Sequence, residues 1–182
     1  MNDEPAVPRL IASDATIGYD RHIIVERLAI EIPDGSFTAI IGPNGCGKST
    51  VLRALARVLA PSLGQVLLDG RDIASYKSKD VARRLGLLPQ TSFAPEGIRV
   101  ADLVARGRGP YQSLFQQWRV SDQQAVEDAL AATRLTELSG RLVDELSGGQ
   151  RQRAWVAMLL AQQTDIMLLD EPTTFLDIAH QF

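Results

Sequence analysis

From residue 10 to residue 32 the pattern of polar and apolar positions is short and more alternating than elsewhere, which predicts a half-exposed antiparallel strand. Its apolar side would carry Leu28, Ile30 and Ile32, and its polar side Arg27, Ala29 and Glu31. Residues 33–35, Pro-Asp-Gly, supply a turn. The apolar run at residues 37–41 then predicts a buried strand, and the apolar spacing over residues 51–59 predicts a helix.

Shorter elements are expected in the middle of the chain. They are a turn at residues 61–64, a strand at 65–68, a turn at 69–70, a helix that begins near Ser78 and contains Val81 and Ala82, and a strand at 85–88 that leads to Gln90. The pattern therefore continues to alternate strands and helices, which is typical of an α/β protein.

No run typical of a strand occurs between Gln90 and Ser147, whereas residues 100–106 and 126–135 have helical spacing. We therefore expect an inserted helical lobe at about residues 91–147. Two interpretations of its aromatic residues stay open at this point: the rings pack the lobe, or some of them line a groove for a partner. These residues are Tyr111, Phe115 and Trp118.

The C-terminal part of the chain predicts a helix followed by a strand. Residues 154–161 are entirely apolar, which is expected of a helix buried on most sides. Residues 166–169 then predict a buried strand that ends in Asp170 and Glu171. Two carboxylates at a strand end are often solvated loop residues, but after a phosphate loop they suit Mg²⁺ coordination and the polarisation of an attacking water.

Residues 42–50 match the phosphate-loop pattern G-x-x-x-x-G-K-[ST]. Glycines let successive backbone N–H groups face one point, and the helix that follows adds its positive end. Lys48 can reach the β- and γ-phosphates, and the Ser49 hydroxyl can ligate Mg²⁺. The expected nucleotide-binding residues are Gly42, Pro43, Asn44, Gly45, Cys46, Gly47, Lys48, Ser49 and Thr50.

Three further positions carry candidate ligand contacts. Tyr19 follows a glycine in an expected loop, where its ring either stacks on a nucleotide base or covers an edge of the core. Gln90 comes at the carboxyl end of a strand, where α/β sheets bind ligands, or is an ordinary polar loop residue. Gly148 and Gly149 begin a helix and expose backbone N–H groups, which favours a second phosphate-binding element.

Composition narrows the class of protein. With 182 residues and 45% hydrophobic content the chain suits one domain. A net charge of −3 and a pI near 5.4 disfavour a nucleic-acid partner. The single Cys46, an N-terminus without a signal-peptide pattern and the lack of a membrane-length apolar run fit a reducing cytoplasm. Any membrane link is therefore expected to come through another chain.

Residues 146–150 read Leu-Ser-Gly-Gly-Gln. Together with the phosphate loop and the strand that ends in Asp170 and Glu171, this segment resembles the ATP-binding cassette (ABC) ATPases over almost the whole chain. The resemblance implies an α/β P-loop NTPase fold with an antiparallel β subdomain and an inserted helical lobe. Residues 1–182 would form a single nucleotide-binding domain.

The same resemblance assigns roles for ATP and Mg²⁺. Tyr19 would stack on adenine, Ser49 and Gln90 would hold Mg²⁺, and Asp170 would hold it through water. Glu171 would act as general base. Two cassettes, expected as a homodimer, would meet head to tail, so that one subunit's ATP is capped by the other subunit's signature residues Ser147, Gly148, Gly149 and Gln150. Residues 171–177 would cross to the sister subunit.

Residues 40–48, 105–108, 112–115 and 177–181 are most similar to the subunits that power bacterial iron-siderophore import, particularly the ferric enterobactin type. That implies a peripheral protein on the cytoplasmic face of the inner membrane. It would bind transmembrane permease subunits and act indirectly with a periplasmic or surface substrate-binding protein. Haem and cobalamin importers remain alternatives, as do a soluble cassette without a membrane partner and a fragment that binds nucleotide without turnover.

One departure from the family concerns its switch histidine, which ends a strand after the segment at Asp177. His180 lies only nine positions after Glu171 and is expected on a helix surface, while His22 is expected in a loop. Because the sequence stops at Phe182, we expect a C-terminally truncated cassette that is not competent alone.

Overall fold

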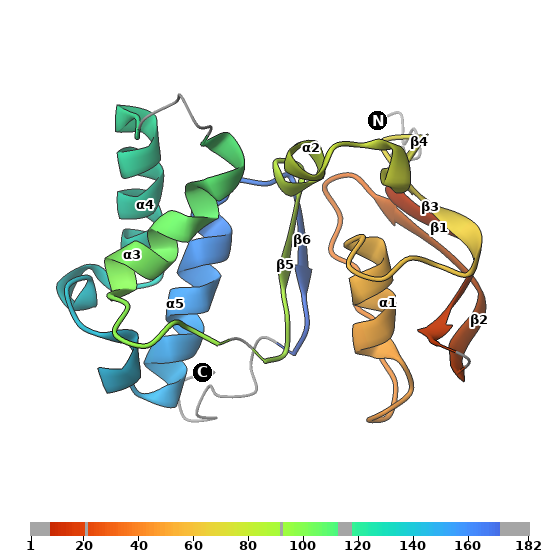
Figure 1. Ribbon diagram of the computed structural model, residues 1–182, viewed down its shortest axis with the longest axis horizontal. Helices are drawn as coiled ribbons and strands as arrows, with labels where there is room; N and C mark the ends of the chain where they lie inside the picture. The colour runs from red at the N-terminus through yellow and green to blue at the C-terminus, as the bar shows by residue number, and fades with distance from the viewer. Residues whose placement is uncertain (1–7, 21, 92, 113–117, 172–182) are drawn as a thin grey trace, which may run out of the picture. The chain divides into compact units, whose positions relative to one another are not determined.

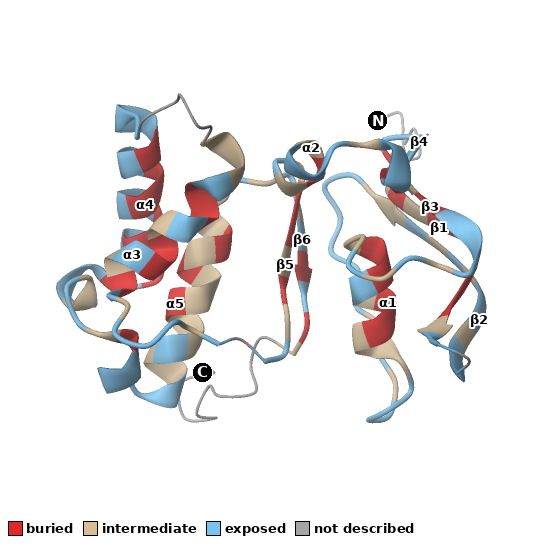
Figure 2. Ribbon diagram, viewed as in Figure 1, coloured by how far each residue is buried: buried red, intermediate tan, exposed pale blue. Residues whose placement is uncertain are grey.

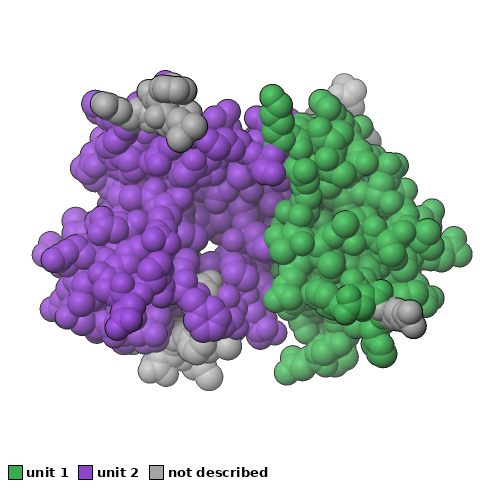
Figure 3. Space-filling view, in the orientation of Figure 1, with its two compact units in different colours: residues 1–77 green, residues 78–182 purple. Residues whose placement is uncertain are grey.

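The structure is a computed structural model that describes residues 8–20, 22–91, 93–112 and 118–171. Its contacts divide the chain into two compact units, residues 1–77 and residues 78–182 (Figure 3). The phosphate loop belongs to the first unit, and the helical lobe to the second. Each unit is described by itself.

The first unit is built on a four-stranded antiparallel sheet with the order β2-β1-β3-β4 (Figure 1). The strands are β1 (Pro8–Tyr19), β2 (His22–Pro33), β3 (Leu63–Leu68) and β4 (Arg71–Asp72), with helix α1 (Lys48–Leu55) and the short 3-10 helix η1 (Ile73–Ser75). Leu10 pairs with Ile32 on one side and with Leu68 on the other, which places β1 centrally. The predicted antiparallel strand is confirmed.

Burial in this unit follows the predicted pattern (Figure 2). Leu28, Ile30 and Ile32 of β2 are half-buried, while the residues between them are exposed. The central strands and α1 supply the core of the unit, which contains Leu10, Ala12, Ala15, Ile17, Val51, Ala54, Leu55, Val66 and Leu68. Apolar side chains on one face of α1 therefore hold the helix that follows the phosphate loop in place.

Four expectations for this unit are wrong, and one of them is the loop at Tyr19, which instead ends β1 because it pairs with His22 of β2. Residues 37–41 form no strand, and Phe37 and Ile41 are 93% and 91% exposed. A strand needs hydrogen-bonded partners, and none of the described strands pairs with this run. The helix ends at Leu55, four residues early, since Arg57 adopts a left-handed φ of 60°. His22 begins β2 instead of lying in a loop.

The second unit contains a two-stranded parallel sheet of β5 (Leu85–Leu88) and β6 (Ile166–Leu169). Both strands have their predicted bounds, and Leu85 pairs with Ile166 and Leu88 with Leu169. The prediction that β6 is buried is only half right, because Leu168 is buried whereas Met167 and Leu169 are 48% and 40% exposed. Alternate residues of a strand point to opposite faces, so only one face of β6 is covered.

Helices make up the rest of the second unit. They are α2 (Ser78–Ala82), α3 (Val100–Ala105), η2 (Arg106–Tyr111), α4 (Val120–Ala132), η3 (Thr136–Leu138), η4 (Val143–Glu145) and α5 (Gly148–Ala161). The predicted helices are confirmed, although α4 begins six residues earlier than expected. Helices α3, α4 and α5 share one core, formed by Val100, Leu103, Val104, Val126, Ala129, Leu130, Leu135, Val143, Leu146, Ala154, Ala157 and Ala161.

The C-terminal half of α5 is held closely by its neighbours. A Cβ atom on Gly107 of η2 would lie 2.2 Å from the carbonyl oxygen of Met158, so only glycine fits there. Gln162 follows the helix and donates from Nε2 to the carbonyl oxygens of Ala82 (2.6 Å) and Leu85 (3.4 Å). These contacts tie the helix to η2 and to the start of β5.

Candidate functional site

The phosphate loop turns on two glycines in the left-handed region. Gly45 has a φ of 81° and Gly47 a φ of 97°. Gly47 caps α1, and its carbonyl oxygen accepts a 2.9 Å hydrogen bond from the N–H of Val51. A Cβ on Gly47 would also lie 2.9 Å from Cγ2 of Ile24. The loop therefore requires glycine for its φ and for its close approach to β2, and it forms the concave backbone that suits an anion.

Lys48 is the first residue of α1 and points back over the loop. Its Nζ donates to the carbonyl oxygens of Gly42 (2.9 Å) and Pro43 (3.0 Å). The N–H of Cys46 donates to the same Pro43 oxygen (3.3 Å), and the Cys46 side chain is exposed. A cation held above a glycine turn at a helix start fits the charge and size of nucleotide phosphates.

Tyr19 lies at the end of β1, and the residue is 41% exposed. Nη1 of Arg53 donates to the Tyr19 hydroxyl (3.0 Å). That hydrogen bond from Arg53 lowers the pKa of Tyr19, with burial opposing the shift and a weaker hydrogen bond from Thr50 adding to it. The exposed ring is thus tethered to the helix that follows the phosphate loop. This exposure fits base stacking better than core packing, and stacking stays a prediction.

Gln90 and Glu171 come together at the carboxyl ends of β5 and β6. Nε2 of Gln90 donates to Oε2 of Glu171 (2.7 Å). The N–H of Asp170 donates to the carbonyl oxygen of Leu88 (2.9 Å), and Asp170 is only 4% exposed. Parallel strands present their carboxyl ends at one edge, so an amide and two carboxylates gather where α/β sheets bind ligands.

Ser147 caps α5 through a reciprocal pair of hydrogen bonds. Its Oγ accepts from the N–H of Gln150 (3.2 Å), and Oε1 of Gln150 accepts from the N–H of Ser147 (3.0 Å). This capping box fixes the first turn of the helix. The N–H groups of Gly148 and Gly149 lie in that turn, where an α-helix has no internal acceptor for them. The segment thus has the geometry of an anion-binding helix start.

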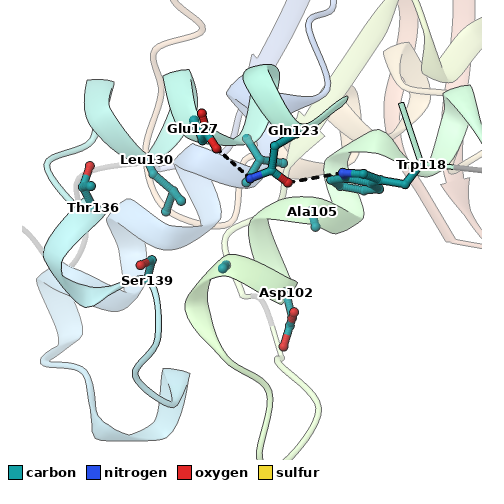
Figure 4. Close-up of a pocket in the computed structure, with 10 residues that line it drawn as sticks. Asp102, Ala105, Trp118, Gln123, Glu127, Leu130, Thr136 and Ser139 are labelled. Carbon is teal, nitrogen blue, oxygen red and sulfur yellow. Dashed lines mark hydrogen bonds between the residues drawn. The ribbon is translucent and has the colours of Figure 1, made fainter. Parts of the chain in front are cut away.

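A cavity of about 500 Å³ lies between α3 and α4 on the helical lobe (Figure 4). Nε1 of Trp118 donates to Oε1 of Gln123 (3.3 Å), whose Nε2 donates to Oε1 of Glu127 (2.7 Å). The wall is apolar with an acidic rim and consists of Ala101, Asp102, Ala105, Trp118, Gln123, Val126, Glu127, Leu130, Thr136 and Ser139. Trp118 thus lines a cavity, whereas Phe115 lies outside the described residues.

Tyr111 packs inside the lobe, under the guanidinium of Arg108 at 4.0 Å from the ring centroid. Arg108 is buried and also donates from Nε to Oδ1 of Asp122 (2.8 Å). Neither this ion pair nor the contact of Arg53 with Tyr19 was predicted, because these residues belong to no motif and meet partners that are distant in the chain. Nothing in the chain order brings Arg108 and Asp122 together until η2 and α4 fold.

The predicted site residues divide between the units. Tyr19 and residues 42–50 lie in the first unit, and Gln90, residues 147–150 and residues 170–171 lie in the second. Residues 172–177 and His180 lie outside the described residues. Within the described part of the chain, no helix is long and apolar enough to cross a membrane.

A glycine-turned phosphate loop before a helix, with an acidic pair ending a parallel strand, defines a P-loop NTPase. The family model described as ABC transporter matches residues 25–174. The chain belongs to the ABC transporter family of ATPases.

Two curated relatives have similar sequences. The ferric enterobactin transport ATP-binding protein FepC of Escherichia coli (strain K12) is 59% identical, over 97% of this chain and 65% of its own length. The petrobactin import ATP-binding protein FpuD of Bacillus anthracis is 55% identical, over 91% of this chain and 61% of its own length. The chain thus spans less than two thirds of the length of these relatives.

A solved structure agrees with the fold. A chain of an ABC transporter described as metal-chelate type, in an inward-facing conformation, superposes with a TM-score of 0.78 at 31% identity. The match covers 94% of this chain and 63% of the other. The arrangement of elements is therefore that of a known transporter ATPase fold.

Proposed function

We propose that this chain is the ATP-binding and ATP-hydrolysing part of an ABC importer that drives uptake of ferric siderophores. The observation that carries the proposal is the phosphate loop, in which Gly45 and Gly47 turn the backbone and Lys48 crosses above it. The similarity to two ATP-binding proteins named for ferric enterobactin transport and petrobactin import supports the cargo class.

The loop residues provide the first contact with ATP. Residues 44–48 would offer backbone N–H groups to the phosphates. Lys48 would give up its hydrogen bonds to the carbonyl oxygens of Gly42 and Pro43 and donate to phosphate oxygens instead. Ser49, Gln90 and Asp170 offer oxygen atoms, the ligand type that Mg²⁺ prefers, so the donor set fits this ion. Bound Mg²⁺ would offset negative charge on the phosphates. Tyr19 would stack on the base.

Glu171 is the proposed general base for the attacking water. Its carboxylate accepts a hydrogen bond from Gln90, which orients the carboxylate at the end of β6. Since phosphoryl transfer asks for little covalent chemistry from the protein, holding the water and the base in line supplies most of the rate.

A second copy of the chain would complete the site. The capping box of Ser147 and Gln150 presents the N–H groups of Gly148 and Gly149 at the start of a 14-residue helix. This helix start would cap ATP on the phosphate loop of the other subunit. Closure of two cassettes around ATP, followed by hydrolysis, would then act as a switch.

Permease subunits of the membrane are the proposed partners of the helical lobe, which places the protein at the cytoplasmic face. The cavity in Figure 4 combines apolar wall residues such as Val126 and Leu130 with the carboxylates of Asp102 and Glu127. A short amphipathic helix with a basic residue complements that surface. A substrate-binding protein would take part only through the permease.

Uptake by a strain that lacks this protein tests the proposal. We expect loss of uptake of radioactive iron supplied as ferric siderophore, with haem and cobalamin uptake unchanged. Wild-type protein should restore uptake, and Lys48→Ala should not, because the cation that faces the phosphates is missing. Lys77→Ala, an exposed lysine outside the loop, serves as the matched control.

If uptake of haem or cobalamin is lost instead, the proposal that the cargo is a ferric siderophore is contradicted. Restoration by folded Lys48→Ala would contradict the ATP-driven mechanism. Co-purification of the wild-type protein from membranes, with mass spectrometry of the bound chains, tests the permease partner separately.

A further inference from the structure

A second cavity of the lobe, of about 300 Å³, is lined mostly by arginine and hydroxyl groups. It lies where the residue after α2 meets η2 and the first turn of α4. Its lining residues are Arg83, Arg108, Tyr111, Arg119, Ser121 and Asp122. Three arginines against one carboxylate leave a net charge of +2 around a small cavity.

The buried arginine is already committed to the fold. Arg108 is 4% exposed, and its Nη1 donates to the carbonyl oxygen of Ala161 (2.8 Å) and to Oε1 of Gln163 (2.9 Å), while Nε holds Asp122. Asp122 therefore neutralises Arg108, and the excess positive charge belongs to Arg83 and Arg119. Both of these side chains are exposed enough to meet a ligand.

Arg83 is fixed toward the cavity without using its full donor capacity. Its Nε donates to the carbonyl oxygen of Pro110 (3.0 Å), and its guanidinium carbon lies 5.6 Å from the centroid of the Tyr111 ring. Among the described residues this is the side-chain hydrogen bond of Arg83, whose backbone N–H donates separately to Lys79, and a guanidinium has five N–H donors. The planar fork is thus oriented by one bond and a ring, as arginines that bind anions are.

We propose that this cavity binds a phosphate group carried by a monoester or free phosphate, held by Arg83, Arg119 and the Ser121 hydroxyl. A phosphate monoester carries close to two negative charges at neutral pH and three acceptor oxygens. That charge balances the excess of +2, and the fork of Arg83 suits two of those oxygens. Nothing in the proposed ATPase chemistry uses this cavity.

A bound phosphate would also join parts of the lobe that the chain keeps apart. Arg83 lies two residues before β5, the strand that leads to Gln90, and Arg119 caps α4. One phosphate that bridges both arginines would fasten the start of β5 to α4. Its source is either a soluble phosphate ester or the phosphomonoester headgroup of a lipid.

Calorimetry in the Lys48→Ala background, where the phosphate loop is weakened, tests the proposal. Inorganic phosphate and glycerol 3-phosphate are titrated at constant ionic strength. We expect Arg83→Gln and Arg119→Gln each to weaken binding about tenfold, because each removes a charge-assisted hydrogen bond. Arg141→Gln, another exposed arginine of the same unit that does not line the cavity, should leave the affinity within about twofold.

Vesicles of phosphatidylcholine with or without phosphatidic acid distinguish the sources. Binding of soluble phosphate identifies a soluble ester, and arginine-dependent retention on phosphatidic acid vesicles alone identifies a lipid headgroup. Each outcome supports the site. If neither probe binds, or if Arg141→Gln weakens binding as much as Arg83→Gln in variants with unchanged thermal unfolding, the proposal is overturned.

Discussion

The amide nitrogen of Gln90 donates a 2.7 Å hydrogen bond to the carboxylate of Glu171, across 81 positions of the chain. The contact arises because β5 and β6 run parallel in register and end at the same edge. It connects a proposed metal ligand to the proposed general base. A shift of one strand relative to the other would therefore alter both roles together.

The first prediction is that, in a version of this subunit that turns over ATP, Glu171→Gln retains ATP binding but hydrolyses ATP about 10² to 10⁴ times more slowly. An amide at this position can still accept the hydrogen bond from Gln90, so the shape survives while the base is lost. Phosphate release and equilibrium ATP binding are measured on the same preparation. Glu137→Gln, an exposed residue of η3, serves as control, and turnover at the wild-type rate in Glu171→Gln would assign the base elsewhere.

The second prediction concerns Tyr19. Tyr19→Ala should weaken ATP binding about tenfold, because stacking of an aromatic ring on a base contributes about 1–3 kcal/mol. Tyr19→Phe keeps the ring and loses the hydroxyl with its hydrogen bonds to Arg53 and Thr50, so its affinity should stay within about threefold. Fluorescent-nucleotide titration measures both. Equal losses in the two variants would show that the hydroxyl, not the ring, supplies the affinity.

The third prediction is that Mg-ATP slows alkylation of Cys46. This thiol is exposed, and it is the single cysteine of the sequence, so the label reports on the phosphate loop alone. A bulky maleimide should in turn block ATP binding, since it would fill the space above the loop. Mass spectrometry follows the label. Equal labelling rates with and without saturating Mg-ATP would mean that nucleotide binds away from the loop.

The fourth prediction is that Asp122→Asn lowers the free energy of unfolding by about 3 kcal/mol at neutral pH, because it leaves Arg108 buried without its carboxylate. Urea unfolding measures the loss. Asp128→Asn, on the exposed side of α4, is the matched control and should have little effect.

The same pair predicts a pH dependence with a definite sign. Burial opposes ionisation of Asp122, but the hydrogen bond from Arg108, the Arg119 backbone N–H and both arginine charges outweigh it and lower the pKa of Asp122. Its contribution is therefore complete above the ordinary aspartate pKa, about 3.9, and is lost as the pH falls through the lower folded value. The stability gap between wild type and Asp122→Asn should be constant from pH 5 to 8 and narrow below about pH 4. A gap that widens at low pH would contradict this assignment.

The sequence predicts those elements whose boundaries are set by residues close to them in the chain. Residues 85–88 are apolar, end at Pro89 and form β5 with the expected bounds, and the glycines of residues 146–150 begin α5 as expected. In each case the residues that set the boundary lie within a turn of it. The phosphate loop is predicted for the same reason, because its φ angles belong to its own glycines.

Features that depend on distant partners could not be predicted in this way. The run at residues 37–41 has the composition of a strand, but a strand exists only where another chain segment accepts its hydrogen bonds. Arg108 looks like any surface arginine until Asp122 and Gln163 are placed around it. The sequence leaves Tyr111 open between packing and partner binding, and the contact of its ring with the Arg108 guanidinium depends on a residue that only folding brings onto it.

Gly107 and Gln162 hold the C-terminal end of helix α5 against η2 and the start of β5. The close approach at Gly107 and the bonds from Gln162 hold the helix near Met158 and beyond, whereas Ser147 lies at its opposite end. Fourteen helical residues extend about 21 Å. Because α3 and α4 share the core of α5, a shift where β5 and η2 meet the helix would be passed along the whole helical lobe to the signature residues.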